Sequence, residues 1–542
     1  MTESYLLWLK RTENLGYLHD ELKSIEGNEN EINDRFYREL AFGTGGLRGI
    51  IGAGTNRMNI FTVGRATDGL ADYVNANFED RSVVIAYDTR NRSREFAKRS
   101  ADILSAKGIK VYIFKEATAT PILSYAVRKL KASAGIVITA SHNPKEYNGY
   151  KVYNERGCQI TGIAAKEITE RISVKSYFTE YKENKELITW IKDEILDEFI
   201  EDIYSLSIFK KVSENAPKIV YTPLNGTGNI PVRMILNKIG VKDVTVVKEQ
   251  EMPDGNFTTC PYPNPEEPVA LELALKEGGK INAELVLATD PDADRVGIAV
   301  RNDNGEFVLL NGNETGILLM NYILERKSSA NILGKSPCIV KTIVTTDMAF
   351  SIAGKYGCEI KEVLTGFKYI GEAMDSLENY VMGLEESYGY LIGKHTRDKD
   401  AVSTVMIAVE MCAYYKSLGK TLYNVLSELY NEHGYYITDL TSKTYKGASG
   451  AIRMREIISN IKAKASLDID SESFEFTDFS LGVDGLPKSD VLRFKNSDVR
   501  ILIRPSGTEP KLKIYYQIKA HSNEKAKEKL KYIKEKVESY LI

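Results

Sequence analysis

A serine, a histidine and an asparagine stand together at Ser141, His142 and Asn143, directly after the apolar run GIVITA. Such a run is typical of a buried strand in an α/β sheet, and ligands of these sheets collect at the carboxyl ends of the strands. A serine hydroxyl held there could act as a nucleophile. The GxSxG pattern of hydrolases is absent, and no Asp in the stretch completes an acyl-transfer relay, so the pattern favours a serine that carries a phosphoryl group. Lys151 could return to the same pocket; the simpler alternative is a serine that caps the next helix and a lysine on the surface.

Three aspartates alternate at Asp290, Asp292 and Asp294, after the apolar run ELVLA. Gathering three carboxylates costs free energy unless a cation neutralises them, so the cluster indicates a hard divalent cation rather than a solvated acidic turn. The same spacing opens a calcium-binding EF-hand loop, but Arg295 and Arg301 stand where that loop needs Gly and Glu. Mg²⁺ is the better match, because it commonly binds a few carboxylates together with a substrate phosphate.

The segment RPSGTEPK lies between two strand-like runs, VRILI and LKIYYQI. Arg504 offers a bidentate fork, Ser506 and Thr508 offer hydroxyls, and Gly507 lets backbone N–H groups converge on one anion. The segment therefore predicts a phosphate cradle, with an ordinary connection between two strands as the alternative.

Two further clusters are polar and glycine-rich. In GLEESYGY, Glu385 and Ser387 present an acceptor and a donor on one side of an extended segment, which suits sugar hydroxyls; the alternative is an exposed acidic pair.

In FGTGGLRGIIG, Arg48 occupies the place of the third glycine of a dinucleotide loop, so NAD binding is excluded. Arg48 is better explained as a cation presented to a phosphate than as part of a plain turn.

Strand-like and helix-like runs alternate along most of the chain, which is the rhythm of α/β domains. The rhythm restarts twice, near Lys218 and near Cys338, and gives way after about Thr441 to strands followed by a charged amphipathic helix. We therefore predict three α/β domains and a smaller α+β domain, with a helical cap over the first ~40 residues. The predicted boundaries are 1–208, 209–326, 327–438 and 439–542.

Length and composition limit the other possibilities. A chain of 542 residues exceeds a single core, and its net charge of −3 argues against nucleic acid or an anionic membrane as partner. The five cysteines are an odd number without CxxC spacing, so neither a disulfide framework nor structural zinc is expected. The sequence shows no signal peptide and no run of ~20 apolar residues, so we expect a soluble, cytoplasmic protein.

Taken in order, GTGGLRG, TASHNP, DPDADR, GLEES and RPSGTEP resemble the motifs of the α-D-phosphohexomutase superfamily, and the likeness over about residues 40–542 is greatest to its phosphoglucomutase branch. The resemblance implies four domains around a central cleft. Three would be related α/β domains, and the C-terminal one an α+β domain similar to the TATA-box-binding protein.

The resemblance also implies roles for the motif residues. Ser141 would be a phosphoserine, and one Mg²⁺ per chain would bind its phosphoryl oxygen together with Asp290, Asp292 and Asp294. Four side chains would surround the transferring group: Arg48, His142, Lys151 and Arg295. Glu385 and Ser387 would bind sugar hydroxyls, with Thr365 and Lys399 nearby. The phosphate that does not react would bind Arg504, Ser506, Gly507 and Thr508. Lys151, Lys399 and His142 are the candidates for the group that takes the hydroxyl proton.

The implied reaction interconverts α-D-glucose 1-phosphate and glucose 6-phosphate, with glucose 1,6-bisphosphate as intermediate and activator. Tyr388 and Gly389 follow the Glu-x-Ser where members that accept mannose often carry Gly-His, which favours glucose; phosphomannomutase or dual specificity is the alternative. Ser387 weighs against a phosphopentomutase. A Ser- and Mg²⁺-dependent phosphatase and a noncatalytic phosphosugar-binding protein are the rival classes. The partner would be a small phosphosugar, and the protein a monomer or weak dimer.

Overall fold

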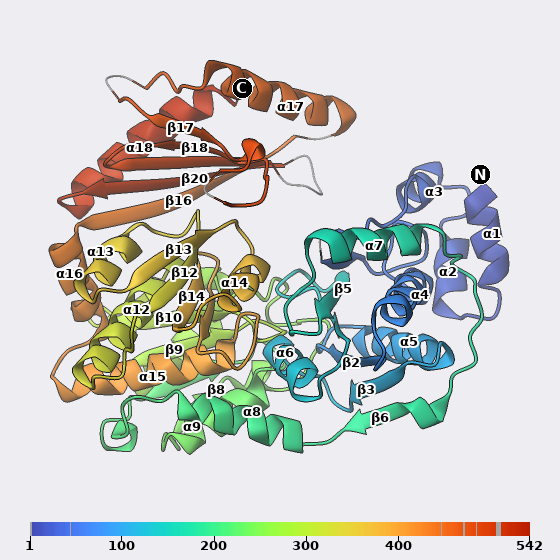
Figure 1. Cartoon of the computed structure of the whole chain (residues 1–542), viewed down its shortest axis with the longest axis horizontal. Helices are drawn as coiled ribbons and strands as arrows, with labels where there is room; N and C mark the ends of the chain where they lie inside the picture. Colours follow the sequence, from blue (N-terminus) through green and yellow to red (C-terminus); the bar gives the residue numbers. More distant parts are fainter. Residues whose placement is uncertain are drawn as a thin grey trace.

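The computed structural model describes residues 3–43, 45–445, 447–469, 472–483, 485–505 and 511–541. The chain builds four β-sheets in sequence order, preceded by three helices (Figure 1). These helices are α1 (Glu3–Arg11), α2 (Tyr17–Ser24) and α3 (Glu29–Phe36). Their apolar faces form a small core of their own around Tyr5 and Trp8, which also contacts Phe61 and Phe178 of the first domain. The first residues are thus helical and pack against the first domain.

The first sheet has the strand order β1-β5-β4-β2-β3-β6. Its strands are β1 (Gly46–Ile50), β2 (Ser82–Tyr87), β3 (Lys110–Phe114), β4 (Ala134–Ile138), β5 (Tyr147–Asn154) and β6 (Ile188–Ile191). Its helices are α4 (Ile60–Asn77), α5 (Ser93–Ala106), α6 (Thr120–Lys129) and α7 (Gly162–Ser173), followed by a short turn, η1 (Lys185–Leu187). Alternate residues of β2 face opposite layers: Val83 and Ile85 pack with α4, α5 and α7, whereas Val84 and Ala86 pack with α6.

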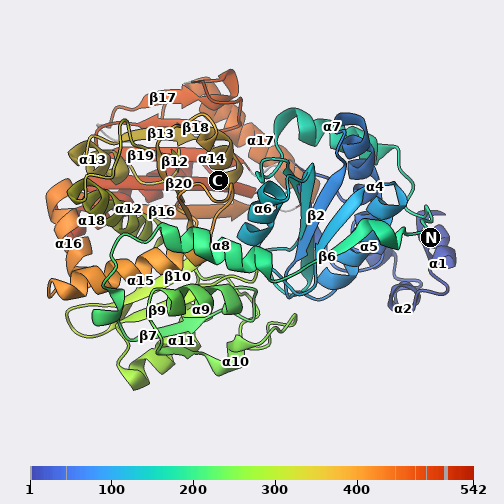
Figure 2. The ribbon, with the colours of Figure 1, turned by 60° about the horizontal axis from the view of Figure 1, so that its bottom comes forward.

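The second sheet has the order β11-β10-β9-β7-β8. Its strands are β7 (Ile219–Thr222), β8 (Val244–Val246), β9 (Leu285–Thr289), β10 (Val296–Arg301) and β11 (Phe307–Leu310). Its helical segments are α8 (Glu194–Ser205), η2 (Val212–Glu214), α9 (Asn229–Lys238), α10 (Lys248–Glu251) and α11 (Pro268–Ile281). Helix α11 covers one face, and α9 covers the other, as Figure 2 shows.

The third sheet has the order β13-β12-β14-β15. Its strands are β12 (Cys338–Thr342), β13 (Glu359–Val363), β14 (Tyr380–Glu385) and β15 (Gly389–Ile392). Its helices are α12 (Gly312–Ser329), α13 (Met348–Lys355), α14 (Phe367–Met374), α15 (Ala401–Ser417) and α16 (Leu422–His433). Helix α15 is buried along nearly its whole length and packs into one apolar core with residues of the second and third sheets, so these two domains are tightly joined.

The fourth sheet is antiparallel, with the order β16-β20-β19-β18-β17. Its strands are β16 (Tyr435–Thr444), β17 (Glu475–Asp478), β18 (Leu492–Lys495), β19 (Val499–Pro505) and β20 (Lys511–Ala520), and its helical segments are α17 (Gly447–Lys464), η3 (Phe479–Leu481) and α18 (Asn523–Ser539). Helices α17 and α18 cover the outer face, and the inner face turns toward the third domain (Figure 1).

Two predicted boundaries cut through elements of the structure. The boundary 326/327 falls inside α12, which packs against the third sheet, because an apolar helical pattern does not tell which sheet the helix covers. The boundary 438/439 falls inside β16, all of which pairs with β20, because only Gly434 separates this strand from α16. The other boundaries stay predictions.

None of the helices in the described residues has the length and apolar character needed to cross a membrane. All five cysteines are buried and free.

Candidate active site

A cleft of about 1040 Å³ lies where the four domains meet. Its wall includes Ser141 from the first domain, Arg295 from the second, Glu385 from the third and Arg504 from the fourth. The cleft therefore depends on all four domains.

Ser141 sits in the tight turn that follows β4. Its φ of 54° lies in the left-handed region, which costs a non-glycine residue free energy and is found most often at functional sites. The backbone N–H of Ser141 donates to Thr139 Oγ1 at 2.7 Å, which helps to hold the turn. The Ser141 hydroxyl donates to Asp290 Oδ2 at 2.8 Å and lies 3.2 Å from His142 Nδ1. The fold thus joins the serine of the first motif to the acidic cluster of the second.

Arg90, which the sequence analysis missed, holds the same turn through hydrogen bonds to its backbone carbonyls. Its buried guanidinium donates to the carbonyls of Ser141 and Asn143, to that of Pro144 at 2.8 Å and to that of Tyr147 at 3.3 Å. Its Nε lies 3.2 Å from a carboxylate oxygen of buried Asp88. The sequence did contain a signal for a site at Arg90, because the segment YDTR at the end of β2 is another polar cluster that follows an apolar run.

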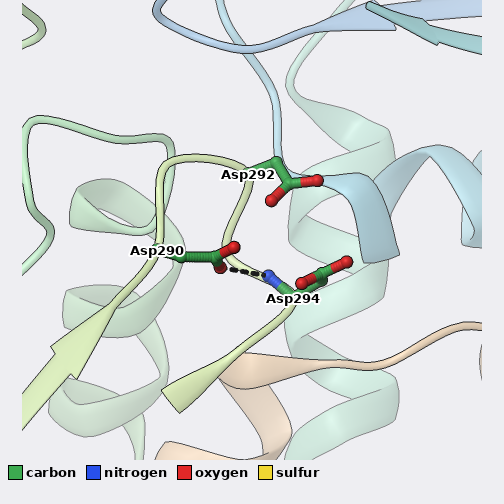
Figure 3. A group of neighbouring side chains, drawn as sticks. All are labelled: Asp290, Asp292 and Asp294. Carbon is green, nitrogen blue, oxygen red and sulfur yellow. Dashed lines mark hydrogen bonds between the residues drawn. The ribbon is translucent and has the colours of Figure 1, made fainter. Parts of the chain in front are cut away.

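The acidic cluster forms the turn between β9 and β10, where Asp290, Asp292 and Asp294 are buried and offer carboxylate oxygens within 4.8 Å of one another (Figure 3). One oxygen of Asp290 accepts the backbone N–H of Asp294 at 3.1 Å, as the dashed line in Figure 3 shows. The Oδ1 atoms of Asp292 and Asp294 have no hydrogen-bond partner among the described residues. Burial and the neighbouring carboxylates raise the pKa of Asp290 well above its usual range. The cluster fits a divalent cation, because it offers carboxylate oxygens as ligands, two of these oxygens lack a hydrogen-bond partner among the described residues, and the carboxylates lie close together.

Positive side chains surround this cluster. Lys151 Nζ lies 3.1 Å from Asp292, and Lys399 Nζ lies 3.1 Å from Asp294. Burial opposes the charge on Lys399, but Asp294 and other nearby carboxylates raise the pKa of Lys399, so it is held protonated. Burial, together with Arg295 and Arg48, lowers the pKa of His142, so its imidazole is neutral at pH 7.

The third domain contributes the expected polar loop. Glu385 Oε1 accepts the backbone N–H of Gly366 at 2.8 Å, and Ser387 also lines the cleft. The hydroxyl of Thr365 is buried without a hydrogen-bond partner among the described residues. Burial raises the pKa of Glu385 to about 7. These groups form a polar wall with acceptors and donors left for a ligand.

The raised pKa of Glu385 predicts a pH-dependent cost in stability. The folded-state pKa of about 7 exceeds the ordinary value of 4.5, so folding is penalised increasingly as pH rises from about 4.5 to about 7, by an amount on the order of 3 kcal/mol at the plateau. The isosteric change Glu385→Gln removes this penalty. We expect the variant to unfold at a higher temperature than the parent at pH 8 and at nearly the same temperature at pH 5. The control is Glu378→Gln, because Glu378 is exposed and lies two residues before β14. An equal shift at both pH values would contradict the prediction.

The fourth domain presents Arg504 at the end of β19, paired in register with Lys513 of β20, and both side chains line the cleft with Lys511. The sequence analysis gave no role to Lys511, the last residue of RPSGTEPK, or to Lys513, two residues further on. Ser506, Gly507 and Thr508 lie outside the described residues, so their part in the cradle stays a prediction. The described part of the segment already places three cations on one wall.

The structure brings the predicted residues that it describes to a single site. Those that line the cleft are Arg48, Ser141, His142, Lys151, Asp294, Arg295, Thr365, Glu385, Ser387, Lys399 and Arg504. Asp290 and Asp292 lie directly beneath it, within contact of Ser141 and Lys151.

Comparison with known families finds the four phosphoglucomutase/phosphomannomutase domain models in order: alpha/beta/alpha domains I, II and III at residues 39–177, 197–305 and 311–433, and the C-terminal domain at 456–534. A phosphoglucomutase of Staphylococcus haemolyticus is 36% identical over 504 residues, which cover 89% of this chain and 91% of that protein. One from Staphylococcus aureus (strain MRSA252) is 34% identical over 535 residues and covers 95% of both chains.

Solved structures share the fold. A phosphoglucomutase/phosphomannomutase family protein from Burkholderia thailandensis superposes with a TM-score of 0.70 at 19% identity, covering 92% of this chain and 97% of its own. Parafusin from Paramecium, in its open form, gives a TM-score of 0.69 at 17% identity, covering 90% of this chain and 91% of its own. The four-domain architecture is therefore the one that these proteins have.

Proposed function

The chain belongs to the phosphoglucomutase/phosphomannomutase family, and from this premise we propose that it interconverts α-D-glucose 1-phosphate and glucose 6-phosphate through a phosphorylated Ser141. The observation that carries the proposal is the contact between the Ser141 hydroxyl and Asp290, 2.8 Å apart inside a cleft to which all four domains contribute. The enzyme is an intramolecular phosphotransferase of the isomerase class.

The acidic cluster is assigned to one Mg²⁺. Asp290, Asp292 and Asp294 would hold it together with a phosphoryl oxygen on Ser141. The Oδ1 atoms of Asp292 and Asp294, which have no hydrogen-bond partner among the described residues, support this assignment. When bound, the ion neutralises part of the charge on the transferring phosphoryl group.

The remaining charge is offset by the chain's own side chains. Phosphoserine carries about −1.5 to −2 charges at neutral pH. Lys151, Lys399, Arg48 and Arg295 bring positive charge to the same place, fixed in position before the reaction begins. The neutral imidazole of His142, with Nδ1 at 3.2 Å from the Ser141 hydroxyl, is placed to exchange a proton with it. Of the three candidates that could take the proton of the sugar hydroxyl, Lys399 is held protonated, so Lys151 and His142 remain.

The reaction runs as two transfers. In the first, the bond between the Ser141 oxygen and phosphorus breaks as the 6-hydroxyl oxygen of glucose 1-phosphate bonds to that phosphorus and loses its proton. The product, glucose 1,6-bisphosphate, turns around, and its 1-phosphate passes to Ser141 and leaves glucose 6-phosphate. The cradle at Arg504 must therefore grip either phosphate, which cations can do because they recognise charge. Glu385, Ser387 and Thr365 would bind the sugar hydroxyls.

We propose that a monomer or weak dimer carries out this reaction in the cytoplasm, on free phosphosugars and without nucleic acid or membrane as partner. The site is completed by four domains of one chain, and the net charge is only −3.

A coupled assay with Mg²⁺ and a trace of glucose 1,6-bisphosphate tests the proposal. We expect kcat/KM for glucose 1-phosphate to exceed that for mannose 1-phosphate and ribose 1-phosphate by at least about 10-fold, a difference of roughly 1.4 kcal/mol between transition states. Inorganic phosphate is measured in the same samples. Higher kcat/KM with mannose or ribose phosphate would reassign the substrate, and release of one phosphate per sugar consumed would show a phosphatase instead.

A further inference from the structure

On the inner face of the fourth sheet, side chains of paired residues form three rows that run across the strands. Each row takes one residue from β19, one from β20 and one from β16. The first row is Arg500, Gln517 and Thr438; the second is Leu502, Tyr515 and Leu440; the third is Arg504, Lys513 and Ser442. All side chains of the third row line the cleft. In the second row, Leu502 and Tyr515 pack in an apolar cluster with Ile343 and Val344 of the third domain.

The first row is fixed to the third domain by polar contacts. The buried guanidinium of Arg500 donates to the carboxylate of Asp347 and, through Nη2, to the carbonyl of Thr345 at 2.5 Å. Gln517 Oε1 accepts the backbone N–H of Asp347 at 2.6 Å. Thr438 Oγ1 accepts from the side chain of Asn313 at 3.0 Å. Every strand of the row is thus tied to the neighbouring domain.

Asp347 is itself held by further cations. Lys341 of β12 is fully buried, with Nζ 3.3 Å from Asp347 and 2.5 Å from Glu362. Lys495 Nζ lies 3.4 Å from the second carboxylate oxygen of Asp347, Oδ2. Although burial opposes ionisation, Arg500, Lys341 and Lys495 lower the pKa of Asp347 to about 2, so its carboxylate stays charged at neutral pH. A guanidinium that binds a carboxylate through Nη1 and a main-chain carbonyl through Nη2 determines orientation as well as distance.

We propose that Arg500 and Asp347 are positioning residues, whose ion pair sets the angle of the fourth sheet and thereby the distance of the Arg504 and Lys513 cations from the phosphate of the bound sugar. The inference rests on the proposed function, because it concerns the same phosphate cradle. Arg500 and Arg504 lie on one face of one strand, roughly 13 Å apart along it. A tilt of about 10° at Arg500 would move Arg504 by about 2 Å, and an error of that size is large on the scale of a charged hydrogen bond.

The consequences differ from those of a catalytic residue. Neither side chain touches the reacting atoms, so kcat at saturating sugar should stay within about 3-fold of the parent. Binding should weaken for both sugars alike, because the cradle holds whichever phosphate is not reacting. For Arg500→Met we expect a rise of at least about 10-fold in KM for glucose 1-phosphate, and a matching rise in the Kd for glucose 6-phosphate, since a lost charged contact is worth more than 1.4 kcal/mol.

The test compares Arg500→Met, Arg500→Lys and Asp347→Asn with the double variant Arg500→Met/Asp347→Asn. Arg500→Lys keeps the charge but not the fork, so its KM and Kd should fall between parent and Arg500→Met. The effects of the two single changes should add to more than the effect of the double variant, because both changes remove the shared contact between Arg500 and Asp347. Arg493→Met is the matched control: Arg493 lies in the same sheet but contacts Thr477 and Phe479 within the fourth domain. It should leave KM and Kd unchanged.

The inference would be overturned if thermal stability fell while KM and Kd stayed at the parent values, or if Arg493→Met weakened binding as much as Arg500→Met. Should Arg500→Met not fold, Arg500→Lys and Asp347→Asn report on the same contact. The Kd for glucose 6-phosphate is measured without turnover. A parent protein that binds the sugar phosphate but does not isomerise it would therefore refute the proposed function and leave this test intact.

Discussion

Ser141→Ala is expected to reduce mutase turnover by at least about 10⁴-fold, because removing a covalent nucleophile leaves only binding and electrostatic effects. The variant lacks the oxygen that would carry the phosphoryl group between the two transfers. It keeps Asp290, Asp292, Asp294 and the cations around them, so binding of Mg²⁺ and of glucose 6-phosphate should persist. Turnover is measured with glucose 1-phosphate and glucose 1,6-bisphosphate, and binding by titration of the variant.

Ser133→Ala is the matched control for this change. Ser133 stands at the opposite end of the same strand, β4, and is equally buried, with its hydroxyl donating to the carbonyl of Asp80 at 2.5 Å. The hydroxyl also accepts the backbone N–H of Ser82 at 3.2 Å, so its removal should cost stability, about 1 kcal/mol for each hydrogen bond. Turnover should stay within about 2-fold of the parent, because these contacts lie at the far end of the strand from the cleft. Turnover retained in Ser141→Ala would remove Ser141 from its proposed role as carrier.

Asp290→Asn is the change with the second largest expected effect, a loss of at least about 10³-fold in turnover, because several kcal/mol of charge stabilisation depend on the bound cation. The asparagine oxygen can still accept the N–H groups of Asp294 and Arg295, which Asp290 Oδ1 accepts at 3.1 and 3.0 Å. The turn should therefore survive. What is lost is one of three charged ligands.

The Asp290→Asn change should also affect the unfolding temperature differently with and without Mg²⁺. Mg²⁺ should raise the unfolding temperature of the parent, since an ion that binds only the folded state stabilises it. Without metal, the three buried carboxylates of the parent repel one another, so metal-free Asp290→Asn should unfold at the same temperature as the metal-free parent or higher. Asp303→Asn, in the turn after β10, is the control and should behave as the parent does. A variant that loses stability without metal and still responds to Mg²⁺ would refute the assignment of the metal site.

The sequence was most informative where a polar residue directly follows a buried strand. The runs GIVITA and ELVLA predicted that Ser141 and the three aspartates stand at strand ends, and both do, after β4 and β9. That these ends face each other could not be read from local pattern, because it depends on how the first two domains pack. The family resemblance supplied that step.

What the sequence could not show are residues that act through main-chain atoms or across domains. Arg90 stands in the polar segment YDTR, but its role of donating to backbone carbonyls of the Ser141 turn could not be predicted, because every residue has a carbonyl. Arg500 lies in the strand-like run VRILI, where one charged residue suggests a solvent-facing position. Its partner Asp347 is in another domain, so only the packing of the fourth domain on the third reveals the ion pair.

The most direct test of the account is to treat the protein with radiolabelled glucose 1,6-bisphosphate, isolate the phosphoprotein and locate the label by peptide mass spectrometry. We expect one phosphoryl group per chain, on Ser141, and its complete transfer to sugar when glucose 1-phosphate or glucose 6-phosphate is added. Label on another residue, or label on Ser141 that either sugar phosphate fails to remove, would contradict the claim that this serine carries the phosphoryl group between the two transfers.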